Sequence, residues 1–153
     1  MNLDQLLLQE KALEFAHFSH QTAWDLGEFL YREAVTRHAS IAIEVYAFGQ
    51  VLFSHAMQGT AKDQQYWIEM KRNSVLRYGR STRYLGEYNQ SKGRVFEDLP
   101  HIDAKTYCAH GGSLPIRLKN SGVIGAITAA GLASDDDHDL VVQAIKYVQE
   151  KEG

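Results

Sequence analysis

The stretch Leu114-Pro-Ile-Arg-Leu-Lys-Asn-Ser-Gly-Val-Ile-Gly-Ala-Ile-Thr-Ala-Ala130 decides the fold class. Two apolar runs, Leu114–Leu118 and Val123–Ala130, flank Lys119-Asn-Ser-Gly122, whose residue types are typical of a turn. Because short turns join antiparallel neighbours, we predict two adjacent antiparallel strands. The second run is apolar enough to be central in a sheet. Its glycine and alanines leave room for a helix or another chain to pack closely against it.

Upstream segments extend this predicted sheet. The run Thr106–His110 reads as a third strand, ended by the diglycine Gly111-Gly112. The β-branched and aromatic runs Ile41–Phe48 and Val51–His55 flank Gly49-Gln50, and glycine at the first of two turn positions indicates a type II′ hairpin. The sequence therefore predicts a five-stranded antiparallel sheet.

Helical periodicity and capping signatures surround these strands. Ser/Thr-x-x-Asp patterns occur at Thr22–Asp25, Thr60–Asp63 and Ser134–Asp137. We expect helices over 3–18, 22–37, 60–78 and 81–89 and from 134 to the end, with a long loop over 93–103. Helices covering an antiparallel sheet make an α+β fold, and a profilin-like α/β sandwich satisfies this order of elements.

Composition limits the class of protein. The length of 153 residues suits one domain spanning residues 1–153. A net charge of −3 argues against nucleic-acid and acidic-membrane partners. The single cysteine, Cys108, suits a reducing compartment, and no run approaches the roughly 18 apolar residues that span a bilayer. Since Asp4 lies where a secretory signal carries Lys or Arg, we expect a cytoplasmic protein.

Several motifs of the final third occur in a familiar order. They are His110–Ile116 (His-Gly-Gly-Ser-Leu-Pro-Ile), Gly122–Ile127 (Gly-Val-Ile-Gly-Ala-Ile), Gly131 and the acidic run Asp136–Asp139. This pattern resembles the haem-degrading family that includes the HbpS and GlcG proteins and the C-terminal domain of the PduO cobalamin adenosyltransferases. The stretch from Trp67 to Arg77 is similar to a narrower branch of that family, still classed as uncharacterised. The similarity covers about Ile41 to Lys146.

The resemblance implies a profilin-like fold and a homo-oligomer, since family members commonly assemble into rings or larger symmetric particles. It also implies haem as a ligand, because haem binding and breakdown are reported for some members. The family supplies no general catalytic constellation to transfer. Its extracytoplasmic, haem-sensing members carry a signal sequence, and this sequence is not expected to have one.

The diglycine Gly111-Gly112 is the first candidate for a ligand contact. Successive glycines after a strand let the backbone approach a ligand, and consecutive N–H groups can form an anion-binding nest. The alternative is that the two glycines form only a tight turn or bulge before Pro115.

A basic cluster is the second candidate, because no acid occurs between Lys71 and Arg83. Trp67 and Lys71 are four residues apart on the expected helix, so they could stack a planar ligand and neutralise its carboxylate or phosphate. Arg72 is a further cation for such a pocket. The alternative is a solvated helix face whose arginines pair with acids of a neighbouring subunit, and we favour it for Arg77 to Arg83.

The histidines show no zinc-motif spacing, so we expect no structural metal site. His110 adjoins the diglycine and is the best placed to contact a ligand or haem iron. Its alternative role is that of a strand-end histidine bonded to the backbone. The run Asp135–Asp139 is best explained by helix capping, with His138 as an exposed partner of its aspartates. Cys108 is expected to be a buried small hydrophobe in a strand.

Three functions remain open. The first is a small-molecule-binding oligomer that holds haem or another planar anionic ligand. The second is an oligomeric adaptor or scaffold without a ligand. The third is a haem-degrading enzyme with His110 or His55 as the iron ligand. The sequence lacks dinucleotide-binding, P-loop and nucleophile-elbow motifs, so nucleotide-binding and hydrolase functions lack their signatures. The residues expected to bind the ligand are Trp67, Lys71, Arg72, His110, Gly111 and Gly112.

Overall fold

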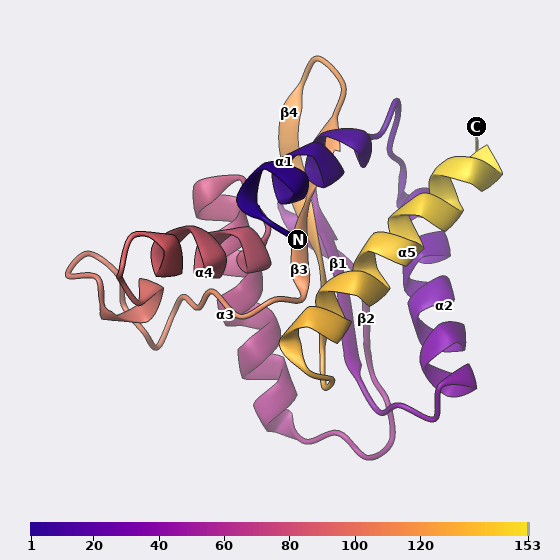
Figure 1. The fold of residues 1–153 in the computed structure, drawn as a ribbon. Coiled ribbons are helices and arrows are strands. Elements are labelled where there is room, and N and C mark those ends of the chain that lie inside the picture. Colours follow the sequence, from indigo (N-terminus) through magenta and orange to yellow (C-terminus); the bar gives the residue numbers. More distant parts are fainter. Residues whose placement is uncertain (153) are drawn as a thin grey trace.

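The computed structural model describes residues 1–152 and contains one antiparallel sheet of four strands in the order β2-β1-β4-β3 (Figure 1). The strands are β1 (Ala42–Ala47), β2 (Gln50–Ala56), β3 (Ser113–Leu118) and β4 (Gly122–Ala130). β4 pairs with both β1 and β3, so the apolar run at its core is central in the sheet, as the sequence predicts.

The prediction of a fifth strand over Thr106–His110 is wrong, because the sheet has four strands and this segment is not one of them. This segment crosses helix α3, where side chains take the place of a neighbouring strand. The hydroxyl of Ser74 accepts from the Cys108 N–H at 3.1 Å and donates to the Cys108 carbonyl at 2.7 Å. Glu97 accepts from the Ala109 N–H at 2.7 Å. Since these backbone groups are satisfied locally, the segment needs no place in the sheet.

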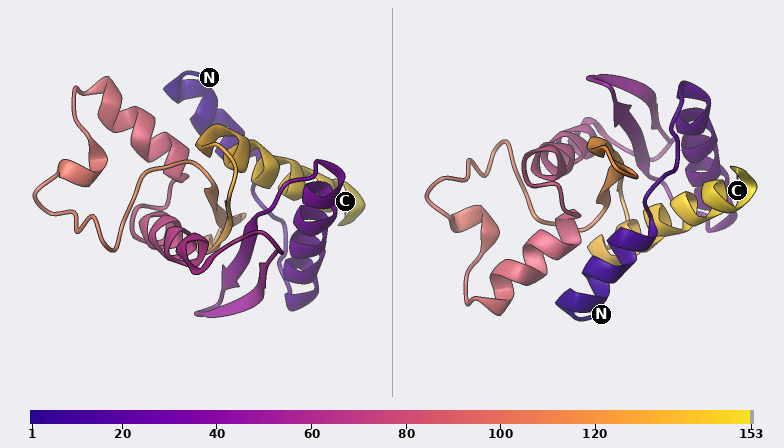
Figure 2. Two further views of the ribbon diagram at one scale, coloured as in Figure 1. Left: turned by 90° about the horizontal axis from the view of Figure 1, so that it is seen from below. Right: turned by 90° about the horizontal axis from the view of Figure 1, so that it is seen from above.

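Helices cover both faces of the sheet. They are α1 (Leu3–Ala12), α2 (His20–Thr36), α3 (Lys62–Tyr78), α4 (Thr82–Ser91) and α5 (Ser134–Glu152), with a 3-10 turn over Phe96–Asp98. Figure 2 shows α2 and α5 on one side of the sheet and α3 on the other. The first helix ends at Ala12 rather than near residue 18, because Phe15 leaves the helix and bonds the edge strand. Its N–H donates to the Arg117 carbonyl at 2.7 Å.

The alternation of side chains along the strands divides the core in two. Residues such as Ile43 and Ile127 face α2 and α5 and form the larger cluster. On the opposite face the smaller Ala42 and Ala130 pack against Ile68 of α3. The small side chains of β4 therefore let a helix of the same chain lie close to the sheet.

The hairpin turn is one residue earlier than the sequence predicts. Ala47 pairs with Gln50, so Phe48 and Gly49 are the two central residues. Their φ angles of 55° and 81° make a type I′ turn rather than type II′, because both are positive. The Phe48 ring lies against His20, with 6.4 Å between the ring centroids.

The helix-capping predictions need similar corrections. Ser19, not Thr22, caps α2, and its hydroxyl accepts from the Thr22 N–H at 3.2 Å. Helix α3 begins at Lys62, and Gln64 reaches back to accept from the Ala61 N–H at 2.7 Å. The threonine of the Thr-x-x-Asp pattern is three residues from the true cap in α2 and one residue from it in α3. The pattern alone does not specify the residue at which the chain enters the helix.

We expect Ser19→Ala to lower the free energy of unfolding by about 1 kcal/mol, because the N-terminal amides of α2 lose their acceptor. Urea denaturation measures the change. Thr36→Ala is the control, since that hydroxyl bonds only the Arg32 carbonyl at the other end of α2. Equal effects of the two substitutions would contradict the assignment of the cap.

Candidate functional site

A pocket of about 360 Å³ opens between the first half of α3 and the start of α5. It gathers segments that are distant in sequence, because β4 ends there and the loop before β3 passes its rim. Its lining residues are Gln64, Trp67, Lys71, His110, Ala130, Gly131, Leu132, Ser134 and Asp137. Three of the residues expected to bind a ligand, Trp67, Lys71 and His110, therefore meet in one place.

A buried ion pair forms the floor of this pocket. The Lys71 side chain is 5% exposed, and its ammonium lies 3.2 Å from Asp137 Oδ2 and donates to the Ala129 carbonyl at 3.0 Å. Asp137 also accepts from the N–H groups of Leu132 and Gly131, at 3.0 and 3.3 Å. Burial raises the pKa of the Asp137 carboxyl, and the Lys71 charge opposes that rise.

The diglycine makes room for this pair. A Cβ on Gly112 would lie 2.6 Å from Lys71 Nζ and 2.5 Å from the Ala129 carbonyl oxygen, and the φ of this glycine is +136°. A Cβ on Gly111 would lie 2.6 Å from the Ser134 carbonyl oxygen. Both glycines thus allow close packing of backbone and Lys71, and a ligand contact at either one stays a prediction.

Two aromatic rings stand at the mouth of the pocket. The Trp67 and His110 rings meet edge to face, with 5.2 Å between their centroids. The Trp67 indole N–H donates to Asp63 at 3.2 Å, which holds the ring in place. The His110 side chain is 53% exposed, and its Nε2 lies 3.8 Å from Glu97. His110 is therefore accessible to a molecule at the mouth of the pocket.

A second hollow, of about 330 Å³, adjoins the pocket through His110 and Ser134. Gly111 and Arg83 line this second hollow.

Arg72, also expected to bind the ligand, does not line the pocket. Its guanidinium donates to both carboxylate oxygens of Glu44, at 2.8 and 2.9 Å, and lies 4.9 Å from the centre of the Tyr46 ring. Consecutive residues of a helix point in different directions, so Lys71 and Arg72 separate.

Two other arginines of the basic cluster, Arg77 and Arg83, have partners in their own chain. Arg83 lies 3.4 Å from Glu87 and 3.5 Å from both Asp135 and Asp139. The Arg77 guanidinium lies 4.9 Å from the centre of the Tyr107 ring. A neighbouring subunit is not needed to balance Arg83.

The acidic run at the start of α5 contains two residues, Asp137 and His138, that are buried rather than exposed in a helix cap as predicted. His138, expected to be an exposed partner of the aspartates, is fully buried, and its Nε2 lies 2.9 Å from Gln9 Oε1. Burial, followed by the charge of Arg83, lowers the pKa of His138 to about 4. Asp137 holds Lys71 instead of serving only as a cap. Helical periodicity contains the missed signal, because Asp137 and His138 both continue the apolar stripe through Val141.

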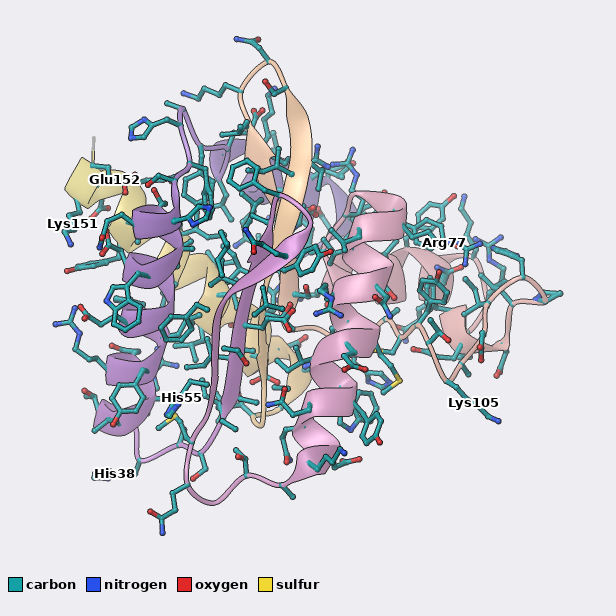
Figure 3. All side chains as sticks on the ribbon, turned by 180° about the vertical axis from the view of Figure 1, so that it is seen from behind. His38, His55, Arg77, Lys105, Lys151 and Glu152 are labelled. Atoms are coloured by element: carbon teal, nitrogen blue, oxygen red, sulfur yellow. The ribbon has the colours of Figure 1, made fainter. Side chains whose placement is uncertain are left out.

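Other candidate groups lie outside the pocket. Cys108 is buried as expected, although not in a strand, and burial raises the pKa of its thiol to about 11. His55 contacts Tyr31, with 5.3 Å between the ring centroids, and Figure 3 shows it on the β2 side, away from Arg77 of α3.

Over the described range 1–152 no three His, Cys, Asp or Glu residues converge on a metal site. Within the same range no helix is long and apolar enough to cross a membrane.

Comparison with known proteins agrees with the resemblance seen in the sequence. A UPF0303 protein of Psychromonas ingrahamii is 51% identical over 144 residues, covering 94% of this chain and 91% of the relative. The Ybr137w crystal structure matches with a TM-score of 0.88 and 26% identity, covering 97% of this chain and 89% of that chain. The PduOC–haem complex shares the fold, with a TM-score of 0.72 and 16% identity over 84% of this chain and 93% of its own. The family model described as "Haem degrading protein HbpS-like" matches residues 18–146, and this chain therefore belongs to the HbpS-like family.

Proposed function

We propose that this chain is a small-molecule-binding protein whose Trp67 pocket holds a planar anionic ligand, with haem as the ligand that the family predicts. The buried Lys71 ammonium at the floor of the pocket carries the proposal. An ammonium has three N–H donors, and within residues 1–152 Lys71 uses two of them, on Ala129 and Asp137. The third is left for a carboxylate or phosphate oxygen in the pocket.

The aromatic rings support a planar ligand. Trp67 and His110 present ring surface at the mouth, where a flat molecule can stack while its acidic edge reaches Lys71. The pocket volume of about 360 Å³ is within the range of small-molecule sites, and the adjoining hollow extends it. Arg72 has no part in the proposed site because its guanidinium donates to the Glu44 carboxylate.

The residues present fit haem. A histidine ring nitrogen is a common haem-iron ligand, and the exposed His110 side chain could supply one. Lys71 would then hold a haem carboxylate. The family description and the haem complex of PduOC support this choice of ligand. Bound haem would supply the oxygen chemistry, and the chain would position it.

The test is a haem titration of the purified protein followed by absorbance in the Soret region. We expect saturable binding, and we expect Trp67→Ala and His110→Ala each to weaken it on the order of tenfold. Lys71 is left intact in this test, because its removal would leave Asp137 buried without its partner.

Matched controls make the result specific. Tyr66→Ala removes an aromatic side chain of α3 that is 54% exposed and does not line the pocket, and His101→Ala removes an exposed histidine. Both should bind haem as the unmodified protein does. His55→Ala tests the other histidine proposed as an iron ligand. Binding that is unsaturable, or equally affected by the control substitutions, would exclude haem from this pocket.

The same samples address assembly and turnover. We propose a homo-oligomer, and an exposed hollow of about 460 Å³ lined by Trp24, Tyr31 and Phe53 supports a contact face for another copy. Light scattering gives the oligomeric mass. An oligomer that takes up no haem would favour the adaptor function. Loss of the haem spectrum after addition of a reductant and oxygen would favour the haem-degrading enzyme.

A further inference from the structure

A second, basic cavity lies on another part of the molecule, beside the junction of α3 and α4. Its volume is about 280 Å³, and its lining residues are Leu7, Lys11, Glu14, Arg80 and Arg117. Helix α1, the α3–α4 junction and strand β3 each contribute to it, and α1 lies against α4 (Figure 1). None of these residues lines the Trp67 pocket.

The cavity has an excess of positive charge. Lys11 is paired with Glu14, with 3.0 Å between the charged atoms. Across residues 1–152 no carboxylate comes within 4.0 Å of the guanidinium of Arg80 or of Arg117. Arg80 and Arg117 line the same cavity. Burial and then the charge of Arg80 lower the pKa of Arg117, and the charges of Glu10 and Glu14 oppose this shift.

The nearest buried acid is already occupied. Glu10 accepts from the Ser81 N–H at 3.0 Å and from the Ser81 hydroxyl at 3.3 Å. Its carboxyl feels the charges of both arginines, yet burial raises its pKa. One carboxyl group held in this way cannot neutralise two guanidinium groups.

Arg117 also has an unused donor. Its terminal nitrogen donates to the Gly79 carbonyl, but its Nε is buried and has no hydrogen-bond partner in the described part of the chain. A buried donor without an acceptor is unfavourable, so an acceptor at this place would be stabilising. The Arg80 guanidinium carbon lies 5.9 Å from the centre of the Tyr84 ring.

We propose that this cavity binds a phosphate-type oxyanion, either inorganic phosphate or the phosphoryl group of a small phosphomonoester. Tetrahedral oxyanions accept several hydrogen bonds at once, and guanidinium groups donate pairs of N–H groups to them. The anion would separate and neutralise Arg80 and Arg117 and would offer an acceptor to the Arg117 Nε.

Calorimetric titration of the full-length protein with inorganic phosphate tests the site at low ionic strength. We expect saturable binding of one phosphate per chain with a dissociation constant below about 10 mM, and a weakening on the order of tenfold in Arg80→Ala. A parallel titration with glycerol phosphate distinguishes the two sources: tighter binding than that of inorganic phosphate assigns a phosphomonoester, and weaker binding assigns the free anion.

Arg94→Ala is the matched control, because Arg94 also lies over a tyrosine ring, that of Tyr88, at 5.8 Å, but outside the cavity. It should bind phosphate unchanged. Arg117→Lys, which keeps the charge and removes the Nε donor, should bind more weakly while unfolding at a similar urea concentration. Absence of saturable binding, or equal weakening by Arg80→Ala and Arg94→Ala, would overturn the proposal.

Discussion

Replacing Asp137 with alanine is expected to lower the free energy of unfolding by about 3–5 kcal/mol. The substitution leaves the Lys71 ammonium, 5% exposed, without its opposite charge. It also removes the acceptor of the Leu132 and Gly131 N–H groups at the start of α5. Urea denaturation at neutral pH measures the loss.

Two comparisons separate the ion pair from a general effect of the acidic run. Asp136→Ala changes the exposed neighbouring carboxylate and should cost less than about 1 kcal/mol, the usual contribution of an acid at a helix N-terminus. The double substitution Lys71→Met with Asp137→Asn removes both charges and keeps an oxygen for the two N–H groups. It should recover most of the stability, because the cost comes from one unpaired buried charge. A double variant as unstable as Asp137→Ala would contradict this explanation.

His138 is expected to contribute a loss of about 3 kcal/mol to the free energy of unfolding as the pH is lowered from about 6.5 to about 4. The pKa of this imidazole is about 4 in the folded chain, below its ordinary value of 6.5, chiefly because of burial. Between the two values the unfolded chain binds a proton that the folded chain does not. The stabilising contribution of neutral His138 is therefore fully present above the ordinary pKa of 6.5, and it is lost as the pH falls to the pKa of the folded chain, about 4.

His138→Gln isolates this contribution, because glutamine does not titrate. Glu10, Glu44 and Asp137 have raised pKa values, so their contributions run in the opposite direction over the acid range and are common to both proteins. Urea unfolding at a series of pH values should give the variant a flatter curve, with the difference accumulating between about pH 6.5 and 4. Parallel curves for the two proteins would refute the assignment. His101→Gln, an exposed histidine, should follow the unmodified protein.

These two predictions concern residues whose roles the sequence suggests only weakly. Asp137 and His138 lie in a run of acids that reads as a helix cap, and the apolar stripe of α5 is the only local sign that they are buried. What they contact comes from other parts of the chain. Lys71 is 66 positions away from Asp137, and Gln9 is 129 positions away from His138. No local pattern encodes such distances.

The candidate pocket also combines features that the local sequence predicts with contacts that only the tertiary structure creates. The four-residue spacing of Trp67 and Lys71 predicts that they share one side of α3, and both line the pocket. His110, which precedes the diglycine, lines the same pocket. Helix spacing already separates Arg72 from Lys71, but its partner Glu44 of β1 comes within 2.8 Å only through the packing of α3 on the sheet. The excess charge of the Arg80–Arg117 cavity likewise results from the docking of α1 and β3 beside the α3–α4 junction.

The sequence by itself determines the α+β class, the order of most elements and the antiparallel pairing of 114–118 with 122–130, because these depend on residue periodicity and short turns. Tertiary structure decides the rest. Thr106–His110 has the residues of a strand, yet Ser74 and Glu97 satisfy its backbone, so it stays outside the sheet. Lys71 and Asp137 are charged residues that become buried because packing brings each its partner. Side-chain partners that are remote in sequence exist only once the layers have packed together, and they decide where charges can be buried.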